Sequence, residues 1–314
     1  FPKFSASANV FGLFGMAAAR TRRINFRTML HILPYHNPLV LAAMIHEFSL
    51  LTGGRYEFGV GRGHGWIPLP AGMPLDETSR PRYEGALDLC GEALHSDGVS
   101  FEGEYWNVKD SQVIPFSGHK FRVVLGGTSD RTYDLAAKHG WAVAVPPLLP
   151  YAALKEQLDL YRTKCAEYGT TPDIIWIHAC YIDDDADLAR REAERHMRGF
   201  LEGNASPLTE YAVPPVDALN AAGYGFYASG IMEKLAATPY DDMIAGDIVW
   251  VGTPDDVIQR IRETIEVCEG LTEIAITTNP GGAEHWKAIK AQELFAEHVV
   301  PVIQREPGAV AVEA

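Results

Sequence analysis

The feature that most constrains the fold is a regular alternation of short apolar runs with longer segments of helical periodicity. FRVVLGG (121–127) is an apolar run, the segment 129–139 has helical spacing and stops at Gly140, and WAVAV (141–145) is apolar again. Strands that are apolar on both faces are typical of a parallel sheet covered by helices, and such a sheet needs helical crossovers. The alternation therefore predicts an α/β fold.

Six strands are expected in all. They are 23–33, 56–63 (a strand that runs into a glycine loop), 121–127, 141–145, 174–182 and 271–278, and the expected helices are 10–20, 38–52, 79–95, 129–139, 150–168, 185–203, one that begins at Thr253, and 283–304. The run FEGEYWNV (101–108) predicts a small hairpin. Six strands fit an open doubly wound sheet, or a (β/α)8 barrel that lacks its first strands, so strand number alone leaves both open.

Residues 204–249 interrupt the rhythm with several prolines, glycines and tyrosines. We interpret this region as an insertion or lid within one domain, 1–314, because the alternation resumes after it. Thr253-Pro254 with two following acids is typical of a helix start, since a capping hydroxyl, proline and negative charge all suit the first turn.

Composition excludes several classes of protein. The formal charge of −14, from 27 Lys+Arg against 41 Asp+Glu, disfavours nucleic-acid binding. The chain has neither an apolar run of the ~20 residues that a membrane helix needs nor a secretory signal, so we expect a cytoplasmic protein without membrane contact. The four scattered cysteines predict free buried thiols and no metal site. No nucleophile elbow, HExxH or P-loop is present.

Four stretches together resemble one family. They are HILPYHNPLVLAAMIHEFSLLTGGRYEFGVGRG (31–63), FEGEYWNV (101–108), VVLGGTSDRTYDLAAKHG (123–140) and VGTPDDVIQRI (251–261). In this combination and order they are similar to the bacterial luciferase-like flavin-dependent monooxygenases. The resemblance implies a TIM-type (β/α)8 barrel whose first strand, helix and second strand would precede Phe1.

The same resemblance implies a function. It points to oxygenation of a small, largely apolar substrate such as an aldehyde or ketone by reduced FMN (FMNH2) and O2, through a C4a-peroxyflavin. It also implies a separate flavin reductase, and a homodimer or heterodimer formed by helices 10–20 and 38–52. Two alternatives stay open: an F420-dependent oxidoreductase of the same fold, and a non-catalytic partner subunit.

Two elements are candidates for binding the FMN phosphate. Gly127-Thr128-Ser129 lies between a strand and a helix start, where backbone N–H groups and the helix dipole favour an anion, and Thr132 adds a hydroxyl one turn later. An ordinary turn with Ser129 as N-cap is the alternative. Arg62, after the second strand, suits bidentate phosphate recognition. By the resemblance Arg80 is a second phosphate ligand, and Arg82 competes for that role.

Three further positions would contact the flavin ring by the resemblance. Met29-Leu30 stands where these proteins carry a non-prolyl cis peptide against the ring, although two ordinary core residues would look the same. Gly61 stands where true luciferases often carry a reactive cysteine. Glycine there leaves more room above the ring and argues against light emission.

Catalytic residues are poorly defined by the sequence. His31, His36 and His178 are weak candidates, and a satisfied core histidine is the favoured interpretation of His31. His64 beside Arg62 is a candidate for the ribityl or phosphate end. Four aromatic residues are candidates for a substrate pocket or for simple packing, namely Trp66, Tyr224, Phe226 and Tyr227.

Overall fold

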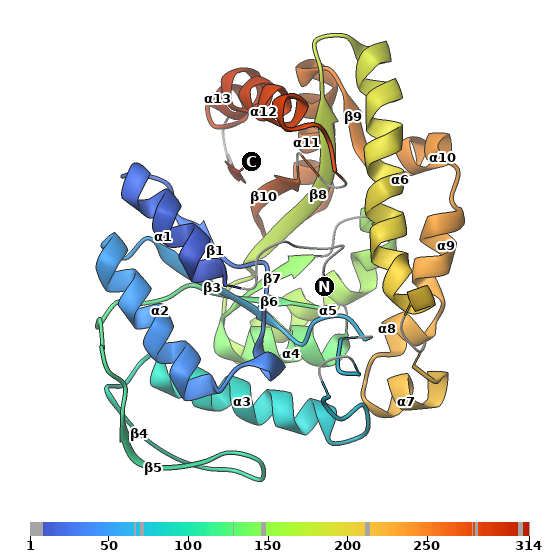
Figure 1. Ribbon diagram of the computed structural model, residues 1–314. Coiled ribbons are helices and arrows are strands. Elements are labelled where there is room, and N and C mark those ends of the chain that lie inside the picture. The colour runs from blue at the N-terminus through green and yellow to red at the C-terminus, as the bar shows by residue number, and fades with distance from the viewer. Residues whose placement is uncertain are drawn as a thin grey trace. The chain divides into compact units, whose positions relative to one another are not determined.

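The computed structural model describes residues 9–65, 67–69, 72–127, 129–145, 149–210, 214–277, 279, 282–306 and 310–313. The chain forms two compact units, Phe1–Gly126 with Leu208–Ser229, and Gly127–Pro207 with Gly230–Ala314. Each unit has its own parallel strands and its own helices (Figure 1). The predicted lid region is divided, because its residues up to Ser229 belong to the first unit and those from Gly230 to the second.

The first unit is built on a parallel sheet with β3 at its centre. β3 pairs with β1 and β2 along one edge and with β6 along the other, in the register Phe26↔Tyr56, His31↔Val60 and Phe58↔Val123. Its elements are α1 (Val10–Arg20), β1 (Phe26–Arg27), β2 (His31–Ile32), the 3-10 turn η1 (Leu33–Tyr35), α2 (Pro38–Thr52), β3 (Tyr56–Gly61), α3 (Ser79–Ala93), the antiparallel hairpin β4 (Gly98–Glu102) and β5 (Asn107–Gln112), β6 (Val123–Gly126), α7 (Val216–Ala221) and α8 (Gly225–Ala228).

Local sequence explains where α2 begins and ends. The Asn37 side chain accepts hydrogen bonds from two backbone N–H groups of the first turn, and Pro38 occupies the first helical position. The helix ends at Gly53, which adopts φ +70°, a left-handed conformation that glycine takes without steric cost. On its buried face, Phe48 contacts the ring of Tyr56 with centroids 5.6 Å apart, so this side of β3 packs against α2.

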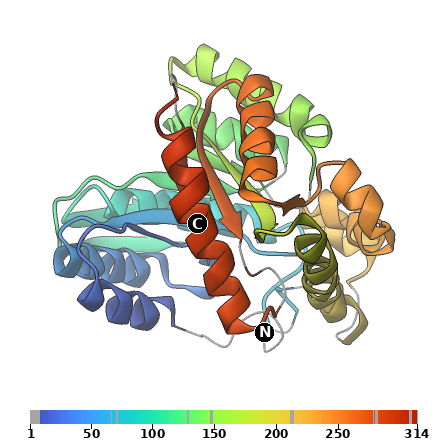
Figure 2. The same cartoon turned by 90° about the horizontal axis from the view of Figure 1, so that it is seen from above.

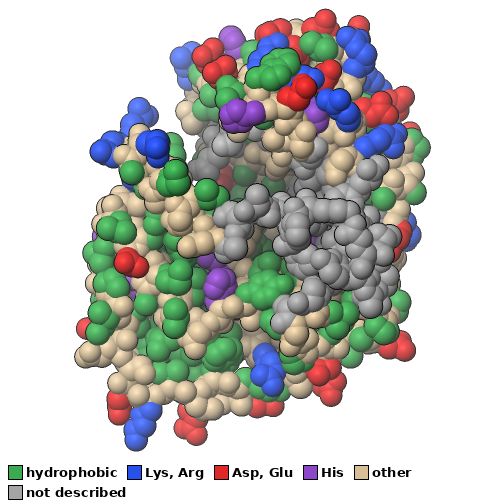
Figure 3. Space-filling model, in the orientation of Figure 1, with side chains coloured by type: hydrophobic (Ala, Val, Ile, Leu, Met, Phe, Trp, Pro, Cys, Tyr) green, Lys and Arg blue, Asp and Glu red, His purple; other side chains and the backbone are tan. Residues whose placement is uncertain are grey.

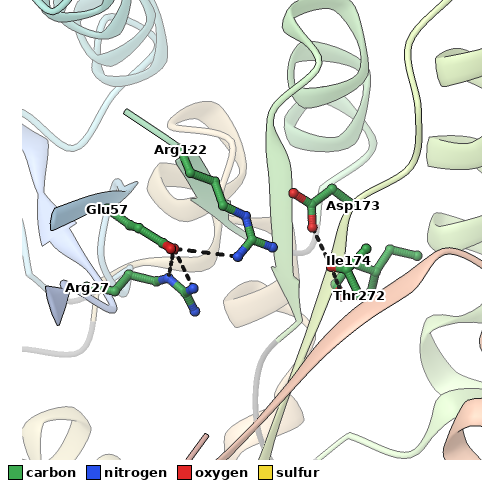
Figure 4. Close-up of polar contacts among 6 residues, drawn as sticks. All are labelled: Arg27, Glu57, Arg122, Asp173, Ile174 and Thr272. Carbon is green, nitrogen blue, oxygen red and sulfur yellow. Dashed lines mark hydrogen bonds and ion pairs between the residues drawn. The ribbon is translucent and has the colours of Figure 1, made fainter. Parts of the chain in front are cut away.

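On the opposite face of this sheet the side chains are charged. Glu57 of β3 accepts hydrogen bonds from Arg27 of β1, whose Nε lies 2.7 Å away, and from Arg122 beside β6 at 3.5 Å (Figure 4). Because side chains alternate between the faces of a strand, Glu57 lies on the face opposite to Tyr56 and Phe48. The ion cluster therefore links three neighbouring strands on the face that α2 does not cover.

The second unit is a parallel sheet with β8 at its centre. β8 pairs with β7, β9 and β10, and β10 also pairs with β11. Its elements are α4 (Asp130–His139), β7 (Ala142–Val145), α5 (Tyr151–Tyr168), β8 (Ile174–Ile182), most of α6 (Ala186–Glu210), α9 (Ile231–Ala237), α10 (Tyr240–Ala245), β9 (Trp250–Gly252), α11 (Pro254–Val267), β10 (Leu271–Thr277), α12 (His285–Leu294), the π turn η2 (Phe295–Val299), α13 (Val300–Ile303) and β11 (Ala311–Glu313).

Within this unit, α11 begins with the predicted cap. Thr253 and Asp256 form a reciprocal capping box, with each side chain accepting a backbone N–H of the other residue. The predicted closing helix is made up of α12, η2 and α13, and its η2 part contacts α11, beside which it lies in Figure 2. At the start of β10, the Thr272 hydroxyl donates to the Asp173 carboxylate at 2.5 Å (Figure 4).

The structure confirms all six expected strands and changes several boundaries. The expected strand 23–33 is two short strands, β1 and β2, because residues 28–30 cross over Gly59, where a Cβ would lie 1.7 Å from the Thr28 carbonyl oxygen. The helix expected to end at 203 continues to Glu210, and the proline-rich lid contains the short helices α7 to α10. As expected, all four cysteines are buried free thiols. Among the described helices none has the length and apolarity to cross a membrane.

Candidate cofactor site

Arg62 follows β3 directly and is held by a distant part of the chain. Its Nη1 donates to the carbonyl oxygen of Ala222 at 2.6 Å, and its Nη2 donates to that of Gly223 at 2.5 Å. The Tyr224 ring lies under the guanidinium, with Cζ 4.1 Å from the ring centroid. The predicted phosphate arginine is thus fixed by the turn between α7 and α8.

Arg80 lies at the same turn. Its Nη2 donates to the Gly223 carbonyl oxygen at 3.2 Å, so one oxygen accepts from both arginines. Arg80 also faces Glu84 at 3.7 Å. Arg82 points elsewhere, because its guanidinium stacks on Tyr105 of the β4–β5 hairpin, 4.3 Å from the ring centroid. The structure therefore brings Arg80, and not Arg82, beside Arg62.

The surroundings of Arg62 include groups that lower its pKa and groups that raise it, the latter being Tyr224, Tyr83 and Glu84. Burial lowers its pKa, and the neighbouring Arg80 lowers it further. Desolvation and a like charge both disfavour the ionised form. An anion at this place would relieve both effects.

Met29 and Leu30 form an apolar surface next to Gly59, Gly61 and Gly126. The Met29–Leu30 peptide bond is cis, as the family resemblance implied. A Cβ at Gly61 would lie 2.6 Å from Leu30 Cδ1, and one at Gly126 would lie 2.4 Å from it. The expectation that Gly61 leaves room above the ring needs correction, since Leu30 already fills that room. A side chain at Gly61 would therefore require Leu30 to move.

His31 belongs to a buried hydrogen-bonded chain. Its Nε2 lies 2.9 Å from the Tyr56 hydroxyl, which lies 3.2 Å from the Thr28 hydroxyl, which donates to the Gly59 carbonyl oxygen at 2.8 Å. Each hydroxyl has one proton, so all three contacts are satisfied only if His31 carries its proton on Nε2 and donates it to Tyr56. Burial lowers the pKa of His31 to about 4, and His36 adds to this. His31 is a neutral, packed histidine that supports the cis segment.

The other two histidines of this region lie near the same strand end. His36 contacts His31 edge-on, with ring centroids 5.4 Å apart, and burial lowers the pKa of His36. His64 lies 5.6 Å from the Tyr227 ring, and burial lowers its pKa to about 4. Both are neutral at neutral pH and only partly exposed.

The second candidate element lies in the other unit and is local. Ser129 caps α4, and its Oγ accepts the Thr132 N–H and lies 3.0 Å from the Thr132 hydroxyl. A Cβ on Gly127 would lie 3.0 Å from that hydroxyl, so glycine lets Thr132 approach the turn. Thr128 lies outside the described residues. Both the N-cap and the predicted placement of two hydroxyls on one face of the turn are observed.

His178 lies in the closed core of the second unit. Its ring contacts Trp250 with centroids 4.2 Å apart, its Nδ1 accepts from the Trp176 indole at 3.3 Å, and it is fully buried. Burial lowers its pKa to about 3. Its Nε2 has no hydrogen-bond partner among the residues that the structure describes. His178 therefore packs against Trp250 in the core of this unit.

The aromatic residues of the lid pack on the loop after β3. Leu219, Ala222 and Tyr224 form a buried cluster, against which Tyr227 packs. A Cβ on Gly65 would lie 2.8 Å from Leu219 Cδ2. Phe226 contacts Tyr227 edge-on, and Trp66 is outside the described residues. Sequence reasoning missed the roles of Tyr56 and of the 222–223 carbonyls, because neither carries a sequence signal. Nowhere in the described ranges do three His, Cys, Asp or Glu side chains gather as a metal site.

Comparison with known proteins identifies the family. The family model for luciferase-like monooxygenases matches residues 1–268. The 2,5-diketocamphane 1,2-monooxygenase 1 of Pseudomonas putida is 47% identical over 312 residues, covering 93% of this chain and 84% of that protein. The chain belongs to the luciferase-like monooxygenase family. It is accordingly an oxidoreductase of the flavin-dependent kind.

Other relatives carry names that cover a wider range of reactions. The 4-hydroxyprotoasukamycin monooxygenase of Streptomyces nodosus subsp. asukaensis is 49% identical, covering 91% of this chain and 75% of that protein. The 5,10-methylenetetrahydromethanopterin reductase of Archaeoglobus fulgidus is 26% identical, covering 94% and 88%. Among solved structures, monooxygenase RslO1 from Streptomyces bottropensis matches with a TM-score of 0.74 at 23% identity, covering 94% of this chain and 83% of that one. This last likeness confirms the predicted luciferase-like barrel class.

Proposed function

We propose that this chain binds reduced FMN and uses O2 to oxygenate a small, largely apolar ketone or aldehyde. Arg62 and Arg80 in the first unit supply cationic donors to the phosphate, and the capped start of α4 in the second unit, at Ser129, is by itself a further candidate phosphate-binding element. The observation that carries the proposal is the pair of guanidiniums that share the Gly223 carbonyl oxygen. Two cations held this close repel each other, and a dianionic phosphate ester would offset that repulsion.

The apolar part of the cofactor also finds a suitable surface. Met29 is 40% exposed, and Met29 and Leu30 lie between β1 and β2, beside Gly59 and Gly61 of β3 and Gly126 of β6. A flat ring needs such a smooth apolar wall. When bound, reduced flavin supplies the electron pair that activates O2, and the residues of this chain bind and orient it and keep water away.

Relatives favour a ketone as substrate. The 47% identical Pseudomonas putida protein is named for a diketocamphane, and another solved relative, a type II Baeyer-Villiger monooxygenase, is in complex with FMN. For a cyclic ketone the balanced reaction is ketone, O2 and reduced flavin to lactone, oxidised flavin and water. One oxygen atom enters the product and the other leaves as water.

Isotope labelling tests this function. Protein, chemically reduced FMN, a bicyclic ketone and ¹⁸O2 should give a lactone that is 2 mass units heavier than the lactone formed with ¹⁶O2. A control with ¹⁶O2 in H2¹⁸O should give no such label in the ring oxygen. The second candidate, hydride transfer from reduced F420, is favoured by the Archaeoglobus fulgidus relative. Reduction of the ketone by reduced F420, without ¹⁸O incorporation, would replace our proposal by this one.

Two partners belong to the same proposal. A separate reductase supplies the reduced FMN, so the isolated protein should not oxidise NADH in the presence of FMN. A second luciferase-like chain covers α1 and α2, whose exposed residues include Leu13, Met16, Val40 and Leu51. Hydrophobic side chains are visible on this face in Figure 3, and a groove of 950 Å³ runs between the two helices. Sedimentation at micromolar concentration should show a dimer, and Leu51→Glu should give a monomer.

A further inference from the structure

The turn between α7 and α8 and the loop after β3 lie 160 residues apart in sequence, yet they form one unit. Both acceptors on Arg62 are backbone carbonyls of this turn, so they persist whatever side chains stand there. Hydrogen bonds to an ionised group are stronger than those between neutral groups. The turn therefore holds the Arg62 guanidinium at two points.

Tyr224 adds a third point of contact. Its ring faces the Arg62 guanidinium, and its hydroxyl donates to the Arg62 backbone carbonyl oxygen at 3.5 Å. The ring is 5% exposed, and in such a desolvated place the attraction between a cation and an aromatic face is at its strongest. The plane of the guanidinium is thereby fixed as well as its position.

Gly223 is required by this arrangement. Its φ is +72°, which side-chain-bearing residues rarely adopt. A Cβ there would lie 2.7 Å from Arg80 Nε. The glycine lets the backbone approach two guanidiniums at once, a close approach that a simple helix connection would not need.

The two carbonyl oxygens orient Arg62 without neutralising it, whereas Arg80 also forms an ion pair with Glu84 at 3.7 Å. A guanidinium has five N–H donors, and the two carbonyls use two of those on Arg62. Among the residues that the structure describes, the other three N–H donors of Arg62 have no hydrogen-bond acceptor, and its charge is available to an anion. The carbonyl contacts therefore orient the Arg62 guanidinium and leave it able to bind an anion.

We infer that Tyr224 and the Ala222–Gly223 carbonyls are positioning residues for the phosphate arginines, so that docking of the α7–α8 turn and binding of the cofactor's phosphate strengthen each other. The inference rests on the proposed role of Arg62 and Arg80 as phosphate ligands. It assigns the lid a part in cofactor affinity, besides any contact with substrate. Since coupling between two binding events is reciprocal, each event must be detectable through the other.

The first experiment compares FMN with riboflavin, which lacks only the phosphate. Titration should show that the unchanged protein prefers FMN, and that Tyr224→Leu lowers this preference about ten-fold while riboflavin affinity stays the same. Tyr224→Phe keeps the ring and should keep the preference. Phe226→Leu is the matched control, because Phe226 contacts Tyr227 in the same segment and does not stack on Arg62. Each ratio is measured within one variant, so a general loss of folding does not imitate the effect.

The second experiment follows hydrogen exchange of the amides in 214–229. FMN should slow their exchange more than riboflavin does, and Tyr224→Leu should abolish the difference. A preference for FMN that survives Tyr224→Leu, or equal protection by both ligands, overturns this inference and leaves the proposed function standing. Equal affinity of the unchanged protein for FMN and riboflavin overturns both, because the arginines would then hold no phosphate.

Discussion

The two proposed phosphate-binding elements differ in how their parts are assembled. In the first unit, Arg62 depends on carbonyls of Ala222 and Gly223, 160 residues away along the chain. In the second unit, Ser129 and Thr132 are three residues apart and order each other within one helical turn. The first element supplies full charges and depends on tertiary structure, whereas the second supplies hydroxyls and a helix N-terminus that form locally.

This difference indicates which element contributes more to anion affinity and which forms more independently of the rest of the fold. Charged donors contribute more to anion binding than neutral ones, but they must be held in place by groups that local sequence does not provide. A capped helix start forms whenever the helix forms. Substitutions in the two elements should therefore differ in size and in what else they disturb.

The largest effect is expected from Arg62→Ala. Loss of a bidentate cationic donor should weaken FMN binding about 100-fold, or roughly 3 kcal/mol, and leave riboflavin binding nearly unchanged. Arg82→Ala is the control, because Arg82 stacks on Tyr105 and should affect neither ligand. Fluorescence titration with both ligands measures this. An equal loss for FMN and riboflavin would mean that Arg62 supports the fold and not the phosphate.

A second comparison concerns the loss of stability when the glycine beside each phosphate-binding element, Gly61 or Gly127, is replaced by alanine. Gly61→Ala places a Cβ 2.6 Å from Leu30 Cδ1 and should lower the free energy of unfolding by about 1–3 kcal/mol. Gly127→Ala meets the Thr132 hydroxyl at 3.0 Å and should cost less. Urea unfolding measures both. The double variant Gly61→Ala/Leu30→Ala should recover part of the loss, and no recovery would refute the assigned contact.

Acid should destabilise the first unit through His31. Its pKa is about 4 in the folded protein against an ordinary value of 6.5, so as pH falls the unfolded chain takes up the proton first. The free energy of unfolding should fall between about pH 6.5 and pH 4, by at most about 1.4 kcal/mol per pH unit for this group, and should not change above that window. His178 shifts in the same direction, so the comparison is between wild type and His31→Gln at pH 5 and pH 7.5. Identical pH slopes would contradict the burial of a neutral His31.

The smallest effect is expected at Ser129. Ser129→Ala removes the cap of α4 and should cost about 1 kcal/mol of stability, with FMN affinity reduced several-fold. Thr132→Val, which keeps the side-chain shape and removes the hydroxyl, should reduce FMN affinity with little loss of stability. A Ser129→Ala protein with unchanged FMN affinity would leave Ser129 as a helix cap alone.

The elements that sequence predicted well are those whose causes are local. The caps at Ser129 and Thr253 both form as hydrogen bonds over three residues, and the six strands follow from apolar runs. The cis bond at Met29–Leu30 was implied by resemblance alone, since two apolar residues on a strand show nothing of it. The role of Gly61 was misjudged because the filling of its space by Leu30 is a contact 31 residues away in sequence.

By itself, the sequence determined the alternation of strands and helices, most helix starts and the family, because each depends on neighbouring residues or on motifs read in order. Only the tertiary structure decided that Arg80 and not Arg82 joins Arg62, that His31 is neutralised within the Tyr56 hydrogen-bonded chain, and that a turn from the lid holds the arginines. These contacts join residues far apart along the chain. Their geometry is set by packing, for which no short stretch of sequence carries a signature.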